Sequence, residues 1–267
     1  MADLSLNYFV EVVKAVLPAL LMNLYVVALN QLSDVESDKI NKPYLPLPSG
    51  ELSINTGKAI AATCFILSFA AGLRFYSPPS LLALVIYCLL GTVYSVDLPF
   101  LHWKNQPFLA GASIASVWSL LFPFGFFIHM QKYVLGKPVV FTKSLKFLVA
   151  FQFVFSSMMA LFKDIPDVEG DTKFGYKSFA AHLGQEKVFW FCINVLLTAY
   201  GTAVVIGAFS PYIFNKLVIV LSHSLLGFML VVRARSIDFT NKDSVSSAYA
   251  FIAQLFVAEF LLIPFIR

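Results

Sequence analysis

The sequence predicts an all-α, polytopic membrane protein, a bundle of about eight transmembrane helices. Of its 267 residues, 59% are hydrophobic and only 13% are charged, and the mean hydropathy is +0.79. Soluble domains are less apolar and more highly charged. Apolar stretches of roughly 17 to 25 residues recur between short polar connections, the length that crosses a hydrocarbon core about 30 Å thick. Within lipid such stretches are helices, because a helix satisfies its own backbone hydrogen bonds.

The hydropathy pattern divides residues 1–267, taken as one domain, into eight spans. Glycine, proline and polar clusters mark the joins. The predicted spans are 9–31, 58–76, 80–96, 107–130, 143–162, 187–208, 212–232 and 246–266.

The composition argues against several function classes. The net charge is +4, but no basic stripe with interleaved aromatics appears, so a nucleic-acid partner is not expected. The three cysteines and four histidines are scattered, without the spacing of a zinc site or a disulfide framework. The first residues have neither the basic start of a secretory signal nor an Arg- and Ser-rich transit segment. Targeting is therefore not readable from them.

Topology places most of the acidic residues on one side of the membrane. Each span reverses the chain, so the connections after spans one, three, five and seven share a face. All of the 15 acidic residues except Asp3, Glu11 and Glu259 fall on or beside it. Lysine and arginine lean weakly toward the same face, which favours the cytosol or its organellar equivalent. An acidic segment follows the first span of each half, which indicates an internal repeat.

The first acidic segment carries Asn30, Asp34 and Asp38, which recur every four residues. On a helix they lie along one face, about one turn apart. The loop after them, residues 41–53, is rich in proline and predicts a stiff, shaped lid.

The second segment carries Asp164, Asp167 and Asp171 at i, i+3 and i+7. This spacing predicts one face of a second helix, which Pro166 must end, kink or begin.

Two acidic rows cannot converge at a membrane interface without a counter-charge. Mg²⁺ accepts oxygen ligands, usually one or two carboxylates with water and substrate phosphate. The alternative for any single aspartate is a solvated loop residue, but the matched spacing and shared face favour two ions that clamp a diphosphate. The candidate metal ligands are Asn30, Asp34, Asp38, Asp164, Asp167 and Asp171.

Five further residues near the rows are secondary candidates. Lys42, Lys163 and Lys173 could bind diphosphate oxygens as point charges; the alternative is a snorkelling lysine. Tyr94 and Ser95 end the third span on the same face and could reach the substrates or a proton transfer. The alternative for Tyr94 is an interfacial anchor.

The segments NQLSDVESDKINKPYLPLPSG and KDIPDVEGD resemble the paired signatures of the UbiA superfamily of intramembrane prenyltransferases. The longer stretches NQLSDVESDKINKPYLPLPSGELS and ALFKDIPDVEGDTKFGYKSF are similar to its plant plastid branch, the homogentisate, flavonoid and coumarin prenyltransferases. The similarity runs from about residue 20 to the C-terminus.

The resemblance implies a bundle with a central cavity in a plastid (chloroplast) membrane, where Mg²⁺ holds a prenyl diphosphate. The expected reaction is electrophilic: the diphosphate leaves, and an electron-rich ring carbon of a phenol attacks the prenyl group. Dimethylallyl or geranyl donors and coumarin or flavonoid acceptors are favoured; the alternative is homogentisate phytyl- or geranylgeranyl transfer in tocopherol and tocotrienol synthesis. A base then removes the ring proton; a carboxylate of the second segment and water are both possible. No protein partner can be named. We expect catalytic roles for Asp34, Asp38, Asp164, Asp167, Asp171 and Tyr94, and substrate contacts from Asn30, Lys42, Lys163, Lys173 and Ser95.

The family usually has nine spans, one more than the eight counted here. The resemblance therefore implies that the first helix is missing and that the chain is a fragment, a shortened splice form or a processed chain. Because its loss would open the cavity wall, we expect reduced or absent activity. A secondary transporter is the competing hypothesis, although its acidic residues should lie near mid-span rather than at span ends. A catalytically inactive membrane subunit is the third.

Overall fold

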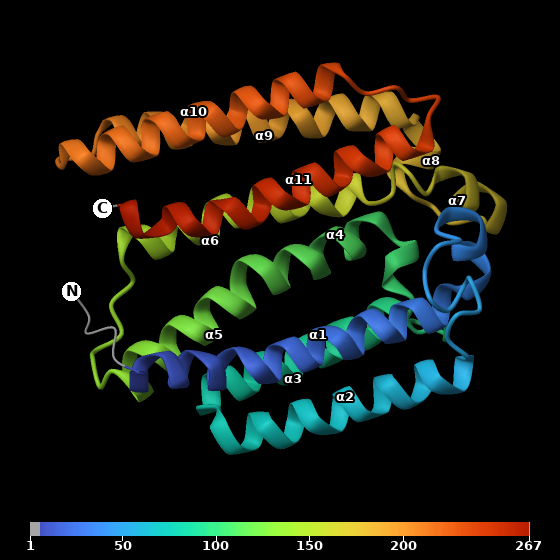
Figure 1. Cartoon of the computed structure of the whole chain (residues 1–267), viewed down its shortest axis with the longest axis horizontal. Coiled ribbons are helices and arrows are strands. Elements are labelled where there is room, and N and C mark those ends of the chain that lie inside the picture. The colour runs from blue at the N-terminus through green and yellow to red at the C-terminus, as the bar shows by residue number, and fades with distance from the viewer. Residues whose placement is uncertain (1–5, 267) are drawn as a thin grey trace. The chain divides into compact units, whose positions relative to one another are not determined.

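The computed structural model describes residues 6–266, and these residues form helices joined by short connections (Figure 1). Seven of the spans are single long helices: α1 (Leu6–Asn41), α2 (Ile54–Phe75), α3 (Pro78–Ser95), α6 (Lys143–Phe162), α9 (Gln185–Ala208), α10 (Ile213–Arg235) and α11 (Lys242–Leu262). The remaining span is built in pieces from α4 (Pro107–Ser116), η2 (Val117–Leu121), α5 (Phe122–Ile128) and η3 (His129–Val134). Short elements complete the chain: η1 (Trp103–Asn105), α7 (Val168–Phe174), α8 (Phe179–Leu183) and η4 (Ile263–Phe265).

Eight segments of this described chain are long and apolar enough to cross a membrane. The all-α membrane architecture and the eight predicted spans are thereby confirmed, while the central cavity stays a prediction. The main difference lies in the first span, which was predicted to end at residue 31 but continues as one helix to Asn41. Nothing in the polar residues that follow breaks a helix until Pro43, which lacks the backbone N–H that a further turn needs.

Capping residues explain where several helices begin. The side chains of Ser53, Thr142 and Asn241 accept hydrogen bonds from backbone N–H groups of the first turns of α2, α6 and α11. These bonds satisfy donors that have no partner within the helix. Pro78 starts α3 at the first helical position, where its missing N–H is not needed.

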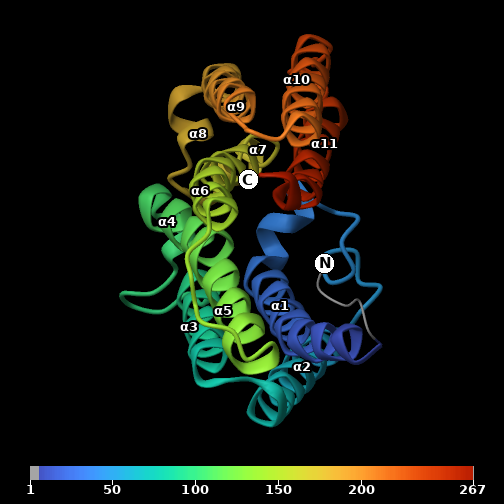
Figure 2. The ribbon, with the colours of Figure 1, turned by 90° about the vertical axis from the view of Figure 1, so that its left-hand side faces the viewer.

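The helices group into two compact units. The N-terminal unit comprises the described chain up to Lys104 together with Leu120–Val140. In it, α1 runs alongside α2 and α3 (Figures 1 and 2). Gly91 permits the close approach of α3 to α1, because a Cβ there would lie 2.4 Å from a methyl carbon of Val26.

The C-terminal unit comprises Asn105–Ser119 and the chain from Phe141 onward. Its core is aromatic, with Phe155, Phe162 and Phe189 among its fully buried side chains. Helices α9 and α10 pack along their length, and a Cβ at Gly207 would lie 2.3 Å from Ile219. The second acidic segment extends from this core, because it follows directly on α6.

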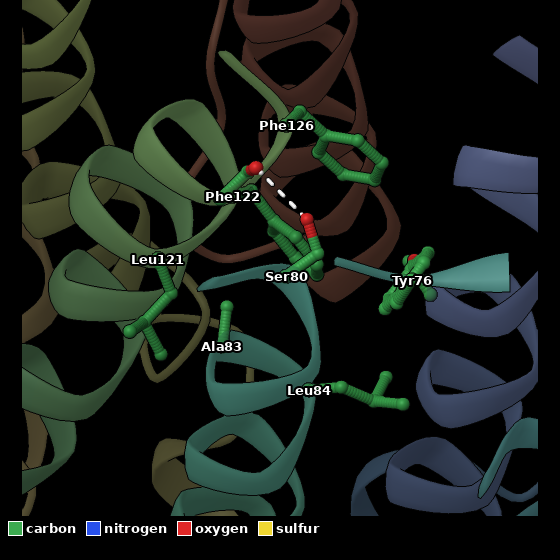
Figure 3. A pocket seen from close by; sticks show the side chains of 9 residues that line it. Tyr76, Ser80, Ala83, Leu84, Leu121, Phe122 and Phe126 are labelled. Atoms are coloured by element: carbon green, nitrogen blue, oxygen red, sulfur yellow. Dashed lines mark hydrogen bonds between the residues drawn. The ribbon is translucent and has the colours of Figure 1, made fainter. Parts of the chain in front are cut away.

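The fourth span is divided between the two units. Its first half, α4, belongs to the C-terminal unit and α5 to the N-terminal unit, and the boundary falls within the π-helical turn η2. Beside α5, a cavity of about 10 Å³ lies among Tyr76, Ser80 and Phe122, where Ser80 donates a hydrogen bond to the carbonyl of Gly125 (Figure 3). That volume is at the lower limit for one water molecule, so this cavity cannot hold a substrate.

Candidate metal site

The first acidic segment forms the last turns of α1. Asn30, Asp34 and Asp38 all lie within this continuous helix, so their predicted alignment along one helical face is confirmed. Asp34 forms an ion pair with Lys104, and both side chains are largely buried. Asp38 is buried as well, and its carboxylate lies 3.8 Å from the ammonium nitrogen of Lys42.

The loop after α1 folds back in a series of turns. The N–H of Lys42 donates to the carbonyl of Asp38 at 2.7 Å, and the N–H of Leu45 donates to the carbonyl of Lys42 at 3.0 Å. Leu47 is buried against Gly57 at the start of α2. These contacts give the loop a fixed shape beside Lys42, as the prolines predict, while its role as a lid stays a prediction.

Sequence reasoning missed Lys104 as a site residue. It lies in η1, after a connection in which Phe100 and His102 adopt positive φ angles of 68° and 60°. The indole N–H of Trp103 donates to the carbonyl of Phe100 at 3.2 Å and closes this turn. Lys104 follows the third span, and topology puts that connection on the acidic face, but a lone lysine 70 residues from Asp34 carries no spacing signal.

Tyr94 and Ser95 lie in the last turn of α3, as predicted. Ser95 is 0% exposed, and its hydroxyl has no hydrogen-bond partner among the described residues. Tyr94 is half-buried. The substrate roles of both residues stay predictions.

The second acidic segment does not lie on one helix, which corrects the expected helical row. Helix α6 ends at Phe162, Asp164 lies in the following turns, Asp167 precedes the first residue of α7 without a capping side-chain hydrogen bond, and only Asp171 is helical. The cause is Pro166, which cannot donate a backbone hydrogen bond and disfavours the helical conformation in the residue before it. Of the three alternatives left open for Pro166, the structure shows a helix end.

Backbone and side-chain contacts hold this broken segment in place. The N–H of Asp167 donates to the carbonyl of Asp164 at 3.3 Å, and the N–H of Asp171 donates to the carbonyl of Asp167 at 2.9 Å. The side-chain amide of Gln185 donates to the carbonyl of the fully buried Ile165 at 2.9 Å. Lys163 contacts the Asp164 carboxylate at 2.6 Å.

Asp171 is a buried carboxylate close to the charges of two other aspartates in its segment. Burial raises the pKa of Asp171 to about 6; the hydrogen bond from Ser178 opposes the shift, whereas the charges on Asp164 and Asp167 add to it. Lys163 lowers this pKa only as the smallest of these effects. A nearby cation would favour the ionised form of all three aspartates.

Lys173 stands apart from the other candidate lysines. It is exposed in the last turn of α7, which ends at Gly175 with φ of 72°. Only a glycine adopts this left-handed conformation without strain. The structure therefore gives Lys173 no contact that distinguishes it from a solvated lysine, and its contact with substrate stays a prediction.

The donor set fits Mg²⁺ chemically within each segment. Carboxylate and amide oxygens are the ligands this ion prefers, and Asp38, Asp167 and Asp171 are all buried. As the side chains of residues 6–266 stand, no three histidine, cysteine, aspartate or glutamate side chains converge in a way that could hold a metal ion. Lysines neutralise one acid or more in each segment instead: Lys104 and Lys42 in the first, Lys163 in the second.

Comparison with known families shows to which family the chain belongs. The model of the UbiA prenyltransferase family matches residues 2–255, nearly the whole chain. The chain belongs to the UbiA prenyltransferase family. This match bears out the resemblance carried by the two acidic segments, and it extends to the N-terminal side of residue 20.

Two curated plant relatives match this member of the UbiA family over its full length. It is 50% identical to a coumarin 8-geranyltransferase 1 of Citrus limon, named as chloroplastic, and covers 65% of that protein. It is 47% identical to the chloroplastic homogentisate phytyltransferase 1 of Arabidopsis thaliana and covers 68% of that protein. The chain thus spans about two thirds of the length of these relatives.

The fold is shared with a solved UbiA structure. A UbiA homologue from Archaeoglobus fulgidus, bound to GPP and Mg²⁺, superposes with a TM-score of 0.62 over 98% of this chain and 89% of its own. The sequence identity is 19%. The comparison therefore confirms the UbiA fold, and the Mg²⁺ and GPP belong to that structure.

Proposed function

We propose that this chain transfers a prenyl group from an allylic prenyl diphosphate to a ring carbon of a phenolic acceptor, with Mg²⁺ as cofactor, in a plastid membrane. The observation that carries the proposal is the pair of buried acidic segments, each with lysines against its carboxylates. Topology supports a joint site, because both segments follow odd-numbered spans and so share one face of the membrane. The proposed metal ligands are Asn30, Asp34, Asp38, Asp164, Asp167 and Asp171.

The lysines have a defined role in this proposal. Without substrate, Lys104, Lys42 and Lys163 neutralise carboxylates. Bound Mg²⁺ would supply Lewis-acid stabilisation of the leaving group. With the carboxylates holding the metal, the three ammonium groups would be free to bind diphosphate oxygens. A flexible four-carbon stem makes such a transfer of partners possible. Lys173, exposed on α7, would add a further positive charge to the second segment.

Tyr94 and Ser95 occupy positions from which they could contact the phenolic acceptor. They end α3, which packs on the helix that carries Asp34. The unsatisfied hydroxyl of Ser95 offers a donor and an acceptor to a phenolic substrate. Water-excluding packing around these residues would protect the electrophile from hydrolysis.

Two acceptor classes are supported by the relatives. Identity of 50% to a coumarin 8-geranyltransferase favours a coumarin or another phenol with a geranyl or dimethylallyl donor. Identity of 47% to a homogentisate phytyltransferase supports homogentisate with a longer donor as the second candidate. The difference between these identities is too small to choose between them.

A donor and acceptor panel tests the proposal. Membranes containing the chain are incubated with dimethylallyl, geranyl and phytyl diphosphates against coumarins, flavonoids and homogentisate, with Mg²⁺ or with EDTA. The expected result is a C-prenylated product that requires Mg²⁺ and disappears in Asp34→Ala. Transport of a substrate across the membrane without diphosphate release would reverse the proposal in favour of the transporter.

A further inference from the structure

Ser178 connects Asp171 of the second acidic segment to the helix that follows it. Its hydroxyl donates a hydrogen bond to the Asp171 carboxylate. The same oxygen accepts from the backbone N–H of Ala181 at 3.3 Å and so caps α8. One buried hydroxyl therefore fixes both the Asp171 side chain and the start of α8.

The turn that carries Ser178 is held by a residue far away in the sequence. Just after α7, the N–H of Tyr176 donates to the carbonyl of Asp171 at 2.8 Å. The next backbone N–H, that of Lys177, donates to the side-chain oxygen of Asn105 at 3.1 Å, across 72 residues. The path of the chain from α7 to Ser178 therefore depends on Asn105.

A ring contact beside Asn105 strengthens this attachment. Phe108, in the first turn of α4, meets Phe179, the first residue of α8, edge to face at a centroid distance of 5.5 Å. Helix α4 in turn packs on α6, the helix that leads into the second acidic segment. All of these residues belong to the C-terminal unit. The turn between α7 and α8 is thus attached to the start of α4 at two points.

The surroundings of Asp171 explain why the orientation of its side chain matters. Asp171 is buried, and the charges on Asp164 and Asp167 act against its ionised form. A carboxylate beside two like charges is driven to turn away from them, whereas a shared cation needs all three to point toward it. Hydrogen bonds from outer residues orient metal-ligating carboxylates in proteins. The Ser178 hydroxyl is such a donor.

We propose that Ser178 and Asn105 are positioning residues for Asp171. Ser178 orients the carboxylate, and Asn105 holds the turn on which Ser178 lies. Their role in supporting a magnesium ligand rests on the proposed function, whereas the support of the turn by Asn105 does not. Asn105 directly follows Lys104 in the chain, so η1 contacts the first acidic segment through the Lys104–Asp34 pair and the turn behind the second through Asn105.

Hydrogen exchange without metal tests the turn. The full chain is placed in lipid nanodiscs in EDTA, and exchange of the backbone amides of 176–181 is followed by mass spectrometry. Asn105→Ala should speed exchange of the Lys177 amide by at least about fivefold, because that amide loses its acceptor. Asn105→Asp keeps an oxygen at the same position and should restore slow exchange. The matched control is Gln106→Ala, which removes an exposed neighbouring side chain without a cap hydrogen bond and should exchange like the wild type.

Metal affinity tests whether the turn positions a ligand. Mn²⁺ replaces Mg²⁺ as the probe, because its free concentration is read directly by electron paramagnetic resonance. Ser178→Ala should raise the Kd for Mn²⁺ by about tenfold, the lower end of the range for outer residues of metal sites, and Asn105→Ala by about threefold. Ser178→Thr, which keeps the hydroxyl, should restore the wild-type Kd. Prenyl transfer at saturating metal should keep its kcat within about twofold, because metal binding and not the chemical step is altered.

Two results would overturn the proposal. Unchanged exchange of the Lys177 amide in Asn105→Ala would show that the turn does not depend on Asn105. Faster exchange with an unchanged Kd for Mn²⁺ in both alanine variants would make the turn a structural element only. Because Ser178 also caps α8, Asn105→Ala is the deciding variant if Ser178→Ala does not fold. A wild type that binds Mn²⁺ but transfers no prenyl group would refute the proposed function, and the expected shifts in Kd would still support the positioning role.

Discussion

The two acidic segments present similar side chains on different backbones. The first lies on α1, an unbroken helix of 36 residues, so its ligands keep the regular spacing of one turn. The second passes from the end of α6 through turns into the seven-residue helix α7. Regular backbone fixes the first set by its own hydrogen bonds, whereas the second depends on Pro166, on the Gln185 contact and on charge balance. The first segment should therefore tolerate metal removal better than the second.

The largest expected effect tests whether both segments are needed. Asp38→Asn and Asp167→Asn should each lower kcat/KM by about 10³-fold, because loss of one carboxylate removes several kcal/mol of charge stabilisation at the leaving group. Radiolabelled geranyl transfer in membranes provides the measurement. Asp97→Asn is the matched control, since this carboxylate is 84% exposed and lies on the same face; its activity should stay within about twofold. Full activity of Asp167→Asn would remove the second segment from the site.

The lysines should give the next largest effect. Lys104→Met and Lys163→Met are expected to lower kcat/KM for the prenyl diphosphate by about 10- to 100-fold, the range for a hydrogen bond to a charged group. Lys39→Met is the control, because Lys39 pairs with Glu36 on the exposed side of α1. If Lys104→Met raised activity, its contact with Asp34 would be inhibitory rather than a reserve of charge for the substrate.

The backbone difference itself can be tested through two prolines. Pro166→Ala should lower kcat about tenfold, because the second segment gains conformations that misplace Asp164 and Asp167. Pro18→Ala, inside the continuous helix α1, should leave kcat within about twofold. Both are read from initial rates at saturating donor. Equal effects of the two substitutions would show that the broken backbone has no special role.

The sequence alone was sufficient for features that depend on neighbours along the chain. Hydropathy predicts the eight spans, and a spacing of four residues predicts the alignment of Asn30, Asp34 and Asp38 on α1. It left the outcome at Pro166 open, because a proline is compatible with a helix start, kink or end until the surrounding packing is known.

The sequence could not predict pairs of residues that are far apart along the chain, for a different reason. Lys104 pairs with Asp34 across 70 residues, and His223 meets Glu259 from a separate helix. Each residue looks unremarkable in its own segment: Lys104 is one loop lysine among several, and Glu259 is one acid away from the acidic face. Only the packing of helices brings such pairs together, and no local spacing encodes it.

The smallest expected effect concerns stability and has opposite signs with and without metal. Because the pKa of Asp171 is raised to about 6, its ionised form is disfavoured in the folded state, and the resulting loss of stability is fully present above that pH and relieved as pH falls through it. In EDTA at neutral pH, Asp171→Asn should therefore be more stable than the wild type by about 1 kcal/mol, or roughly 2–4 °C in Tm. Added Mg²⁺ should raise the Tm of the wild type above that of the variant.

The control is Asp238→Asn, whose exposed carboxylate has its pKa lowered by donors from Thr240, so that its loss should not stabilise the fold in either buffer. If the wild type were already more stable than Asp171→Asn in EDTA, the second acidic segment would carry no unbalanced charge. The difference between the two acidic segments would then lie in their backbones alone.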